Sequence, residues 1–308
     1  MPSMLGSMIR QLRFKPSPVS NKTRFDGKTA IITGANVGLG LAAAKEMASH
    51  GLSRLILGVR TLTKGEQAKK EILKNSSMVD VQVWELDQES YESIQAFAAR
   101  AQALEELDIV ILNAGVKNME FSRSKTGHES NIQVGENCIP FDLKSDAFKV
   151  NVLGPALLSL LLLPLLQQTA TKHECKTPTR LTFTSSDVHF WTPFAEKDAP
   201  AILTRLDEES SFNAKAAIER YNTSKLVSLL WARELKNKVH ASKDIIINFV
   251  NPGLCSTSLH RSDKTPGLGL VLKATAWSAT QGGHTLVDAV ANHTDSPGAY
   301  LSEQKVMR

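Results

Sequence analysis

A short apolar run followed by closely spaced glycines constrains the fold of this chain most strongly. Residues 29–32 (TAII) are prone to form a β-strand, and residues 33–40 (TGANVGLG) follow at once. An alanine-rich stretch with helical character then covers residues 41–49. A strand, a glycine-rich turn and a helix start place backbone N–H groups and the positive end of a helix dipole where a diphosphate can bind. The order therefore predicts a dinucleotide-binding unit, although the spacing G-x-x-x-G-x-G differs from G-x-G-x-x-G.

Strand-like and helix-like stretches alternate along the rest of the chain. Such alternation is typical of an α/β fold, in which a parallel sheet is covered by helices on both faces. The 308 residues contain no long linker rich in Pro, Gly or Ser, no internal repeat and no low-complexity block, so we predict one domain over residues 25–308. We expect about seven strands, near residues 29–33, 53–59, 80–86, 108–112, 180–184, 244–250 and 299–302.

Tyr221 and Lys225 are four residues apart in a stretch whose apolar residues have helical spacing. Residues i and i+4 of a helix are neighbours, so both side chains are expected to face one site. A free tyrosine has a pKa of about 10, and a nearby positive charge lowers that pKa. Tyr221 is thus a candidate general acid and base for an oxygen atom. Taken alone, the same pattern arises by chance and would indicate a surface pair.

With both motifs in place, the chain resembles the short-chain dehydrogenase/reductase family from Phe25 to Val306. The family's T-G-x-x-x-G-x-G and Y-x-x-x-K motifs occur here in the same order. The sequence patterns of both chain ends and of the glycine loop are most similar to those of fungal members, many of which act in secondary metabolism. Within the family, the chain resembles a retinol-dehydrogenase-like branch. The resemblance implies a single Rossmann-type doubly wound sheet and an NAD(P)-dependent conversion between a carbonyl and an alcohol on a small, apolar substrate.

The resemblance also implies the catalytic residues. Ser186 follows a β-prone run and matches the family's catalytic serine, which hydrogen-bonds the substrate oxygen. Tyr221 would deliver or remove the proton, and Lys225 would hold the nicotinamide ribose and lower the Tyr221 pKa. Asn151, in the string VNVLG, matches the structural asparagine that supports a water-linked proton path behind Lys225.

The cofactor contacts follow from the same resemblance. Leu112 departs from the asparagine that often precedes the family's N-A-G motif, and we expect little effect on cofactor binding. Asp87 matches the position that contacts the adenine, and Tyr221 and Lys225 also contact the cofactor. The other residues implied to bind it are Gly34, Asn36, Val37, Gly38, Leu39, Gly40, Asn113, Ala114, Gly115, Pro252, Gly253 and Thr257.

Arg60, at the end of the second expected strand, bears on which nicotinamide cofactor binds. An acidic residue there would bond the ribose hydroxyls, whereas arginine can hold a 2′-phosphate with several donors. Arg60 therefore favours NADP(H) over NAD(H). Lys64, one helical turn further on, could add a second charge or could be a solvated helix residue.

Composition narrows the other function classes. The net charge of +5 and pI of about 9.0 come from scattered charges with no basic stripe between aromatic residues, so we expect no nucleic-acid partner. The three cysteines show no metal-ligand spacing and no disulfide framework, so we expect no metal and a reducing, cytoplasmic location. Residues 152–166 are leucine-rich but too short to span a bilayer, and we expect a buried helix and no membrane span. The corresponding helix often forms a subunit interface in the family, so a homodimer or homotetramer is plausible.

Residues 1–24 form an N-terminal arm with scattered basic and apolar residues and two prolines. No signal-peptide core or cleavage site is present. We favour an arm packed on the domain over a membrane contact.

Two segments enlarge the chain relative to compact family members. Ser186 and Tyr221 enclose a wide gap, and we interpret residues 187–219 as an enlarged active-site loop. Its aromatics Phe190, Trp191 and Phe194 could line a pocket for an apolar substrate or equally could anchor the loop. A second flexible wall, residues 254–270, is expected to close over the nicotinamide.

The second unusual segment is residues 134–149, which separate GHESNIQ from VNVLG and contain Gly135 and Pro140. Removing them restores the run expected of one helix. Because valine codons begin with GT and one lysine codon ends with AG, we hypothesise that these residues translate a retained intron; a genuine surface insertion is the competing interpretation. Transcript sequencing decides between them, since messages that all retain these codons would exclude the intron. If translated, the segment threatens the position of Asn151 and predicts a weakened proton relay.

A different class of function is a dinucleotide-binding redox sensor or scaffold without turnover. Such proteins commonly lack part of the Ser, Tyr and Lys set. This chain retains all three residues, so an enzyme is the favoured interpretation.

Overall fold

The computed structural model of the chain describes residues 3–117, 120–121, 153–174, 177–212, 214–239, 244–260, 263 and 265–307. The hypothetical insertion, residues 134–149, and Asn151 lie outside the described residues.

The core of the fold is an eight-stranded sheet with the order β3-β2-β1-β4-β5-β6-β7-β8. Neighbouring strands from β3 to β7 pair in parallel, and β7 and β8 pair antiparallel. The strand order reverses beside β1, so the α/β, doubly wound class predicted from the sequence is confirmed. The strands are Thr29–Thr33 (β1), Arg54–Val59 (β2), Asp80–Glu85 (β3), Ile109–Leu112 (β4), Thr179–Thr184 (β5), Ile245–Asn251 (β6), Tyr300–Ser302 (β7) and Lys305–Val306 (β8).

The predicted count of about seven strands was one short, because β8 escaped the sequence pattern. β8 has only two residues, Lys305 and Val306, so no alternation of apolar and polar residues can reveal it. The turn before β8 places Glu303 and Gln304 at φ angles of 49° and 54°. Two-residue hairpin turns with positive φ at both positions usually carry Asn or Gly. The sequence therefore lacked the turn signal that identifies a hairpin.

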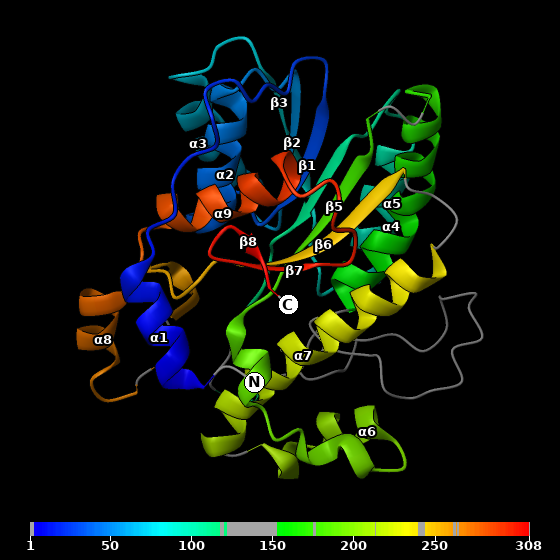
Figure 1. The fold of residues 1–308 in the computed structure, drawn as a ribbon. Helices are drawn as coiled ribbons and strands as arrows, with labels where there is room; N and C mark the ends of the chain where they lie inside the picture. Colours follow the sequence, from blue (N-terminus) through cyan, green and yellow to red (C-terminus); the bar gives the residue numbers. More distant parts are fainter. Residues whose placement is uncertain are drawn as a thin grey trace.

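Helices cover both faces of the sheet (Figure 1). One face carries α2 (Gly38–Ser49), α3 (Leu62–Leu73) and α9 (Ala279–Ala291), and their apolar side chains share one core cluster. The other face carries α4 (Tyr91–Ala101), α5 (Leu153–Lys172) and α7 (Ala214–Lys238), with a second cluster. The central strands are buried on both sides, which explains their continuous apolar sequences.

Helix α5 accounts for the leucine-rich stretch noted in the sequence. Among the described residues, α5 is the one helix that is long and apolar enough to cross a membrane. However, 67% of its most apolar window is buried inside the protein. Its leucines fill the core between the sheet and α4 and α7, so α5 packs as a core helix.

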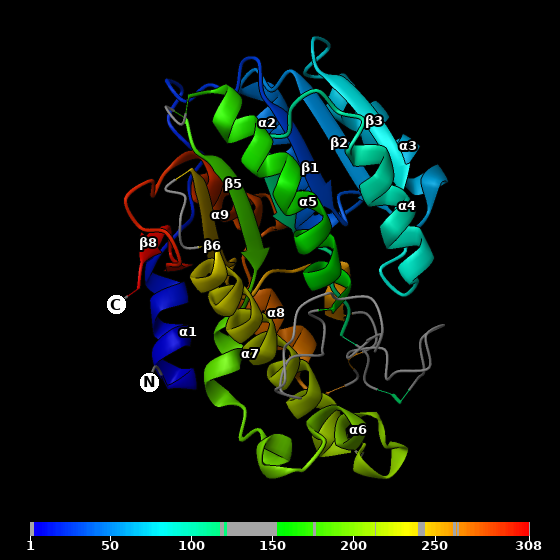
Figure 2. The same cartoon turned by 90° about the vertical axis from the view of Figure 1, so that its right-hand side faces the viewer.

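The carboxyl ends of the strands point to the side of the molecule that carries the smaller elements. Figure 2 shows the strands running down toward α6 (Ile202–Asp207), α8 (Leu268–Thr275) and the first turns of α7. The short helices η1 (Asp187–Trp191), η2 (Ala195–Asp198), η3 (Glu209–Ser211) and η4 (Ser258–His260) follow β5 or β6 in the chain. Ligands of open α/β sheets bind at this edge, where the strand order reverses.

The N-terminal arm contributes α1 (Met4–Arg13), which lies against this edge. Gln11 is buried, and its side-chain nitrogen donates to the carbonyls of Leu254 at 2.7 Å and Thr275 at 2.8 Å. Its side-chain oxygen accepts from the Leu254 N–H at 2.7 Å. The indole N–H of Trp277 donates to the Gln11 carbonyl. One side chain thus satisfies three backbone groups of the segment that follows β6.

A second set of contacts ties α1 to residues beside the expected catalytic serine. Asp187 is buried and accepts hydrogen bonds from Ser7 at 2.8 Å, Arg10 at 2.6 Å and the Tyr300 hydroxyl at 2.8 Å. Arg10 also reaches Glu303 in the β7–β8 turn. The arm is therefore joined to the ends of β5, β6 and β7 at once.

Replacing Gln11 by Ala should destabilise the protein by about 2 kcal/mol, because buried backbone groups of Leu254 and Thr275 lose their partner. Chemical denaturation monitored by circular dichroism measures the change in unfolding free energy. Arg13→Ala, on the exposed side of the same helix, is the matched control and should change stability by less than about 0.5 kcal/mol. Equal stability of the two variants would contradict this account of the arm.

Candidate active site

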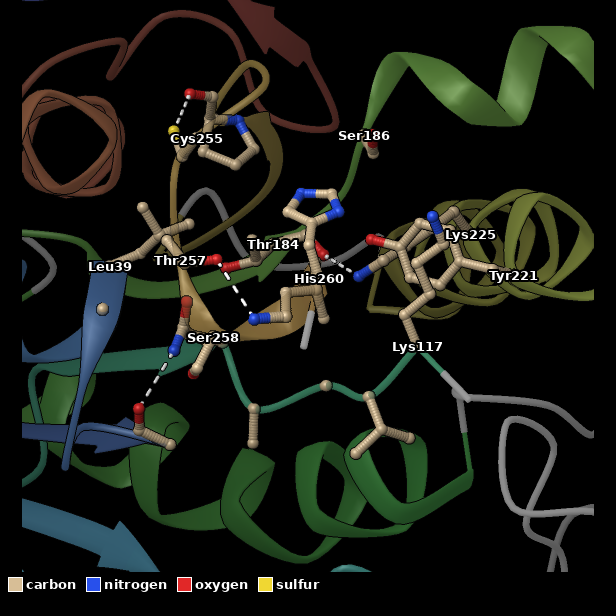
Figure 3. Close-up of a pocket in the computed structure, with 18 of the residues that line it drawn as sticks. Leu39, Lys117, Thr184, Ser186, Tyr221, Lys225, Cys255, Thr257, Ser258 and His260 are labelled. Carbon is tan, nitrogen blue, oxygen red and sulfur yellow. Dashed lines mark hydrogen bonds between the residues drawn. The ribbon is translucent and has the colours of Figure 1, made fainter. Parts of the chain in front are cut away.

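A cavity of about 1170 Å³ opens at the carboxyl edge of the sheet (Figure 3). Its walls come from the loops after β1, β2, β4, β5 and β6, from one face of α7, and from α1 and α8. Residues far apart in the sequence therefore share one chamber. Its position beside the strand-order reversal is the usual ligand position of an open α/β sheet.

The glycine loop forms one end of this cavity. Gly34 and Gly38 have φ angles of 66° and 65°, a region that favours glycine. A Cβ atom on Gly34 would lie 2.9 Å from the Cα of Ala114. Helix α2 begins at Gly38, and its N-cap residue Val37 makes no side-chain capping hydrogen bond. The first N–H groups of α2 thus face the cavity without a side-chain cap, as an anion site requires.

The segment after β4, Asn113 to Gly115, is hydrogen-bonded to the start of the glycine loop. The backbone N–H groups of Asn113 and Ala114 both donate to the Thr33 hydroxyl at 3.0 Å. The Asn113 side-chain nitrogen donates to the Thr33 carbonyl, also at 3.0 Å. A Cβ on Gly40 would lie 2.7 Å from that nitrogen. The two loops therefore fit closely, and Gly115 lines the cavity beside them.

Arg60 lies in the turn after β2 and lines the cavity with Lys64 from α3. Its guanidinium is 3.6 Å from the carboxylate of Glu89, and its side chain is 59% exposed. Asp87, the expected adenine contact, is buried at the cavity wall and accepts from the Glu89 N–H at 3.0 Å. Sequence reasoning missed Glu89, because nothing in its neighbourhood signals that it faces Arg60.

Helix α7 presents one face to the cavity. Ile218, Tyr221, Asn222 and Lys225, at positions i, i+3, i+4 and i+7, all line the chamber. The Lys225 ammonium donates to the Thr184 carbonyl at 2.9 Å and lies 5.8 Å from the centroid of the Tyr221 ring. Figure 3 shows both side chains projecting from the same side of α7. The structure thus brings the predicted pair together at the end of β5.

Burial changes the acidity of this pair in a direction that the sequence did not predict. It raises the pKa of the Tyr221 phenol above the ordinary value and lowers the pKa of Lys225 to about 8. Low-dielectric surroundings disfavour the charged form of each group, phenolate and ammonium alike. The expected lowering of the Tyr221 pKa is therefore wrong for the protein alone. Tyr221 is a neutral phenol near pH 7, ready to donate a proton.

The end of β5 supplies hydroxyl groups next to Lys225. Ser186 lines the cavity and caps η1, where its oxygen accepts weakly from the Val188 N–H at 3.5 Å. The buried hydroxyls of Thr184 and Ser185 also belong to cavity residues and have no hydrogen-bond partner among the described residues. Buried hydroxyls usually have partners, so these two suit a polar ligand. Sequence reasoning singled out only Ser186.

The segment after β6 forms the wall near the glycine loop. Pro252, Gly253 and Thr257 all line the cavity, and Thr257 packs against Gly38 of the glycine loop. Gly253 has a φ of 74°, and a Cβ there would clash with the Trp277 ring at 2.4 Å. The Trp277 backbone also bonds Leu254 and Ser256. Backbone hydrogen bonds therefore hold the base of this wall, and the flexibility expected of residues 254–270 stays a prediction.

The sequence left open whether the aromatic residues between Ser186 and α7 line a substrate pocket or anchor the loop, and the structure shows both roles. Trp191 lines the cavity. Phe190 packs on His189, with ring centroids 3.9 Å apart, and on Tyr300. Phe194 packs against the core cluster of α4, α5 and α7. One aromatic faces the ligand space, and two hold the segment in place.

Polar bonds hold the same segment against α7. The hydroxyls of Thr192 and Thr223 are 2.7 Å apart. Arg220, buried on the side of α7 away from the cavity residues, reaches the Ser211 hydroxyl at 2.8 Å and Glu196 at 3.4 Å. These contacts fix the rotation of α7 and with it the direction of Tyr221.

Three residues that the sequence did not single out lie near Tyr221, and two of them, Lys117 and His260, line the cavity. Lys117 forms an ion pair with Asp263 at 2.5 Å, and its ammonium lies 5.8 Å from the centroid of the Tyr221 ring. Burial raises the pKa of Asp263, but the hydrogen bonds from Lys117 and Thr265 and the Lys117 charge together outweigh burial and lower that pKa to about 2. His260 lines the same wall, and its buried Nδ1 has no partner among the described residues (Figure 3). Burial lowers the pKa of His260, so its imidazole is neutral near pH 7.

Every implied site residue that the structure describes therefore lines the cavity except Gly40, which packs against the Asn113 side chain. Asn151 lies outside the described residues, and its role stays a prediction. A dinucleotide cradle beside a Tyr–Lys pair defines the class of NAD(P)-dependent oxidoreductases. A family model described as short chain dehydrogenase matches residues 28–173.

Comparison with known proteins gives the same class. The short chain dehydrogenase sol3 of Alternaria solani is 58% identical over 304 residues, covering 99% of this chain and 99% of that one. The short chain dehydrogenase/reductase dmxR8 of Cryptosporiopsis sp. is 37% identical over 310 residues, covering 98% and 88%. The chain therefore belongs to the short-chain dehydrogenase/reductase family and is an enzyme of that family.

A solved structure supports the fold independently. The NADPH-dependent 3-quinuclidinone reductase of Rhodotorula rubra superposes with a TM-score of 0.60, covering 93% of this chain and 94% of that one. Its sequence identity is 20%, so the likeness concerns the fold.

The ion pair between Arg60 and Glu89 generates a test of cofactor discrimination. Glu89→Gln removes a negative charge beside the arginine, so the Kd for NADPH should fall about threefold to tenfold while the Kd for NADH changes little. Arg60→Ala should raise the Kd for NADPH about tenfold or more. Fluorescence titration of both cofactors measures these constants.

Glu92→Gln, at an exposed carboxylate near Glu89 that lies outside the cavity wall, is the matched control. An equal gain in NADPH affinity from Glu89→Gln and Glu92→Gln would attribute the effect to net charge alone. Tighter binding of NADH than NADPH by the wild type would overturn the assignment of Arg60.

Proposed function

We propose that this enzyme uses NADPH to reduce a carbonyl group of a small, largely apolar substrate to an alcohol. The observation that carries the proposal is the buried Tyr221 phenol, protonated near pH 7, on the same cavity as the uncapped N-terminus of α2. A phenol held in its neutral form can donate a proton to an oxygen that gains negative charge.

The chain's own residues fit an NADP(H) cofactor. The N–H groups at the start of α2 suit the diphosphate, and the hydroxyls of Thr184 and Ser185, which have no partner in the described part of the chain, suit polar groups of the cofactor. Among the described residues Lys225 donates to the Thr184 carbonyl, and its ammonium carries further N–H donors for the nicotinamide ribose. A bound NADPH supplies the hydride that the substrate carbon accepts. Arg60 and Lys64 would hold the 2′-phosphate, which favours NADPH over NADH.

The protein's part in the reaction is to bind the carbonyl oxygen and to protonate it. Ser186 would donate a hydrogen bond to that oxygen, and Tyr221 would transfer its phenolic proton to it as the C=O bond becomes C–O–H. The Lys225 ammonium would stabilise the phenolate that remains until solvent returns a proton. A positive charge matters most at this moment, because the phenolate is otherwise disfavoured by burial. Asn151, whose position the structure does not describe, is proposed to support that return path.

The far wall of the cavity indicates the substrate class. Most of it is apolar, formed by Met4, Met8, Val116, Val188, Trp191, Ile218, Leu259, Leu268 and Val271. The neutral His260 imidazole offers one hydrogen bond within that wall, because its Nδ1 is buried without a partner in the described part of the chain. A mostly apolar cavity with few placed polar groups favours an apolar carbonyl compound that carries a second polar atom. The likeness to fungal enzymes supports a role in secondary metabolism.

Tyr221→Phe tests the proposal directly. The variant should lose at least about 1000-fold in kcat, because no other described side chain replaces the phenolic proton. Its Kd for NADPH should change less than about threefold, since the ring and Lys225 remain. NADPH oxidation over a panel of ketones, aldehydes and quinones measures turnover.

Tyr91→Phe removes a phenolic hydroxyl from the edge of the core, outside the cavity wall, and serves as the matched control. It should leave turnover unchanged. Full activity of Tyr221→Phe would exclude Tyr221 as the proton donor. Tight NADPH binding without turnover of any substrate in the wild type would instead favour a redox-sensing function.

A further inference from the structure

Helix α1 presents one row of side chains to the cavity and a second, apolar row to its surroundings. The residues at positions i, i+3, i+4 and i+7 that line the cavity are Met4, Ser7, Met8 and Gln11. A second apolar row, at positions i, i+4 and i+7, lies outside the cavity wall and consists of Leu5, Ile9 and Leu12. Leu5 is 68% exposed and Leu12 is 62% exposed. Single exposed leucines are ordinary, but a helical row of them is not.

Helix α8 extends this exposed row. The two helices lie in contact, as Figure 1 shows at the lower left of the molecule. On α8, Leu270 is 76% exposed and lies outside the cavity wall, whereas Leu268 and Val271 line the cavity. We call Leu5, Ile9, Leu12 and Leu270 the outer apolar face. It lies beside the cavity mouth, since α1 and α8 each line the cavity with their other side.

Basic residues accompany the outer apolar face. Arg13 and Lys15 follow its α1 row and are exposed, and Lys273 on α8 is exposed as well. No acidic residue occurs in residues 3–25 or in residues 265–287. Arg10, by contrast, points inward to Asp187 and Glu303. Among the described residues no ion pair of Arg13, Lys15 or Lys273 is found, and their own two segments supply no acidic residue to balance them.

We propose that the outer apolar face docks on the surface of a membrane that contains anionic lipids, with α1 and α8 lying in the interface. An interfacial helix buries apolar side chains at the headgroup boundary and places basic side chains among anionic headgroups. Juxtamembrane basic residues strengthen such binding. The cavity mouth would then open next to the lipid, where apolar carbonyl compounds concentrate. The proposal concerns a binding surface and does not depend on the proposed reaction.

A second copy of the chain fits this face less well. A two-fold dimer buries the same patch of both copies against itself. It would bring Arg13, Lys15 and Lys273 of one copy close to their equivalents, and like charges at an interface oppose association. Anionic headgroups neutralise the same charges. The charge pattern therefore favours a lipid surface as the occupant.

Co-sedimentation with vesicles tests the proposal. The wild-type protein should pellet with vesicles of phosphatidylcholine and phosphatidylserine and much less with phosphatidylcholine alone, and salt should weaken the binding. The triple variant Leu5→Glu/Leu12→Glu/Leu270→Glu should bind the anionic vesicles at least about 100-fold more weakly, because three apolar side chains no longer insert. Arg13→Glu/Lys15→Glu should abolish the preference for phosphatidylserine.

Met78→Glu, at a 95% exposed residue far from α1, is the matched control and should bind like the wild type. The substituted leucines are exposed and lie outside the cavity wall, so NADPH affinity and melting temperature of the triple variant should stay unchanged. Absence of wild-type binding to anionic vesicles would overturn the proposal, as would equal binding of the triple variant. A wild-type dimer in sedimentation velocity that the triple variant abolishes, without vesicle binding, would assign the face to a second copy.

Discussion

The desolvated ammonium of Lys225, on a half-buried side chain, is the constraint on which the active-site architecture depends. It sits at the carboxyl end of β5, and one hydrogen bond to the Thr184 carbonyl holds it there. Burial costs a charged group its hydration, and lowering the Lys225 pKa from 10.5 to about 8 corresponds to about 3 kcal/mol against the charged form. A cost of that size persists only when the surrounding structure holds the residue in place.

The surrounding contacts show how that position is held. Helix α7 carries Lys225 and Tyr221 on one face, while Arg220 on another side anchors the helix to the segment after Ser186. Asp187, in the same segment, accepts hydrogen bonds from Ser7 and Arg10 of the N-terminal arm and from the Tyr300 hydroxyl of β7. Elements from both ends of the chain thus converge on the residues next to the expected catalytic serine. The contacts at the carboxyl edge of the sheet thus offset the desolvation cost of Tyr221 and Lys225, which face the same cavity.

Some of this structure follows directly from the sequence, and the remainder depends on tertiary contacts. The strand β1, the glycine turn and α2 combine local signals, and the structure matches the predicted bounds of β1. Tyr221 and Lys225 were predictable as a pair because helix periodicity places i and i+4 together. The contact between Glu89 and Arg60 was not predictable, because it joins two loops that only the sheet order brings close.

The direction of the Tyr221 pKa shows the same limit. The sequence reveals the neighbouring charge, which favours the phenolate, but not the depth of burial, which opposes it more strongly. The contacts of the N-terminal arm were equally hidden from local patterns, because Gln11 hydrogen-bonds backbone groups of Leu254, 243 residues away in the chain. Short-range patterns therefore predicted which groups carry the chemistry, whereas burial and long-range bonds determine their protonation.

The measurement that tests this account most directly is the titration of Lys225 itself. Protein labelled with [ε-¹³C]lysine, compared with Lys225→Arg to identify the resonance, gives the midpoint by NMR. The folded protein should show a midpoint near 8, so the ammonium charge is lost as pH rises through that value. Because the folded state then binds fewer protons than the unfolded chain, Lys225 should make stability rise with pH between about 8 and about 10.4. A midpoint near 10.4, the ordinary value for lysine, would contradict the claim that desolvation at the carboxyl end of β5 lowers the pKa of Lys225.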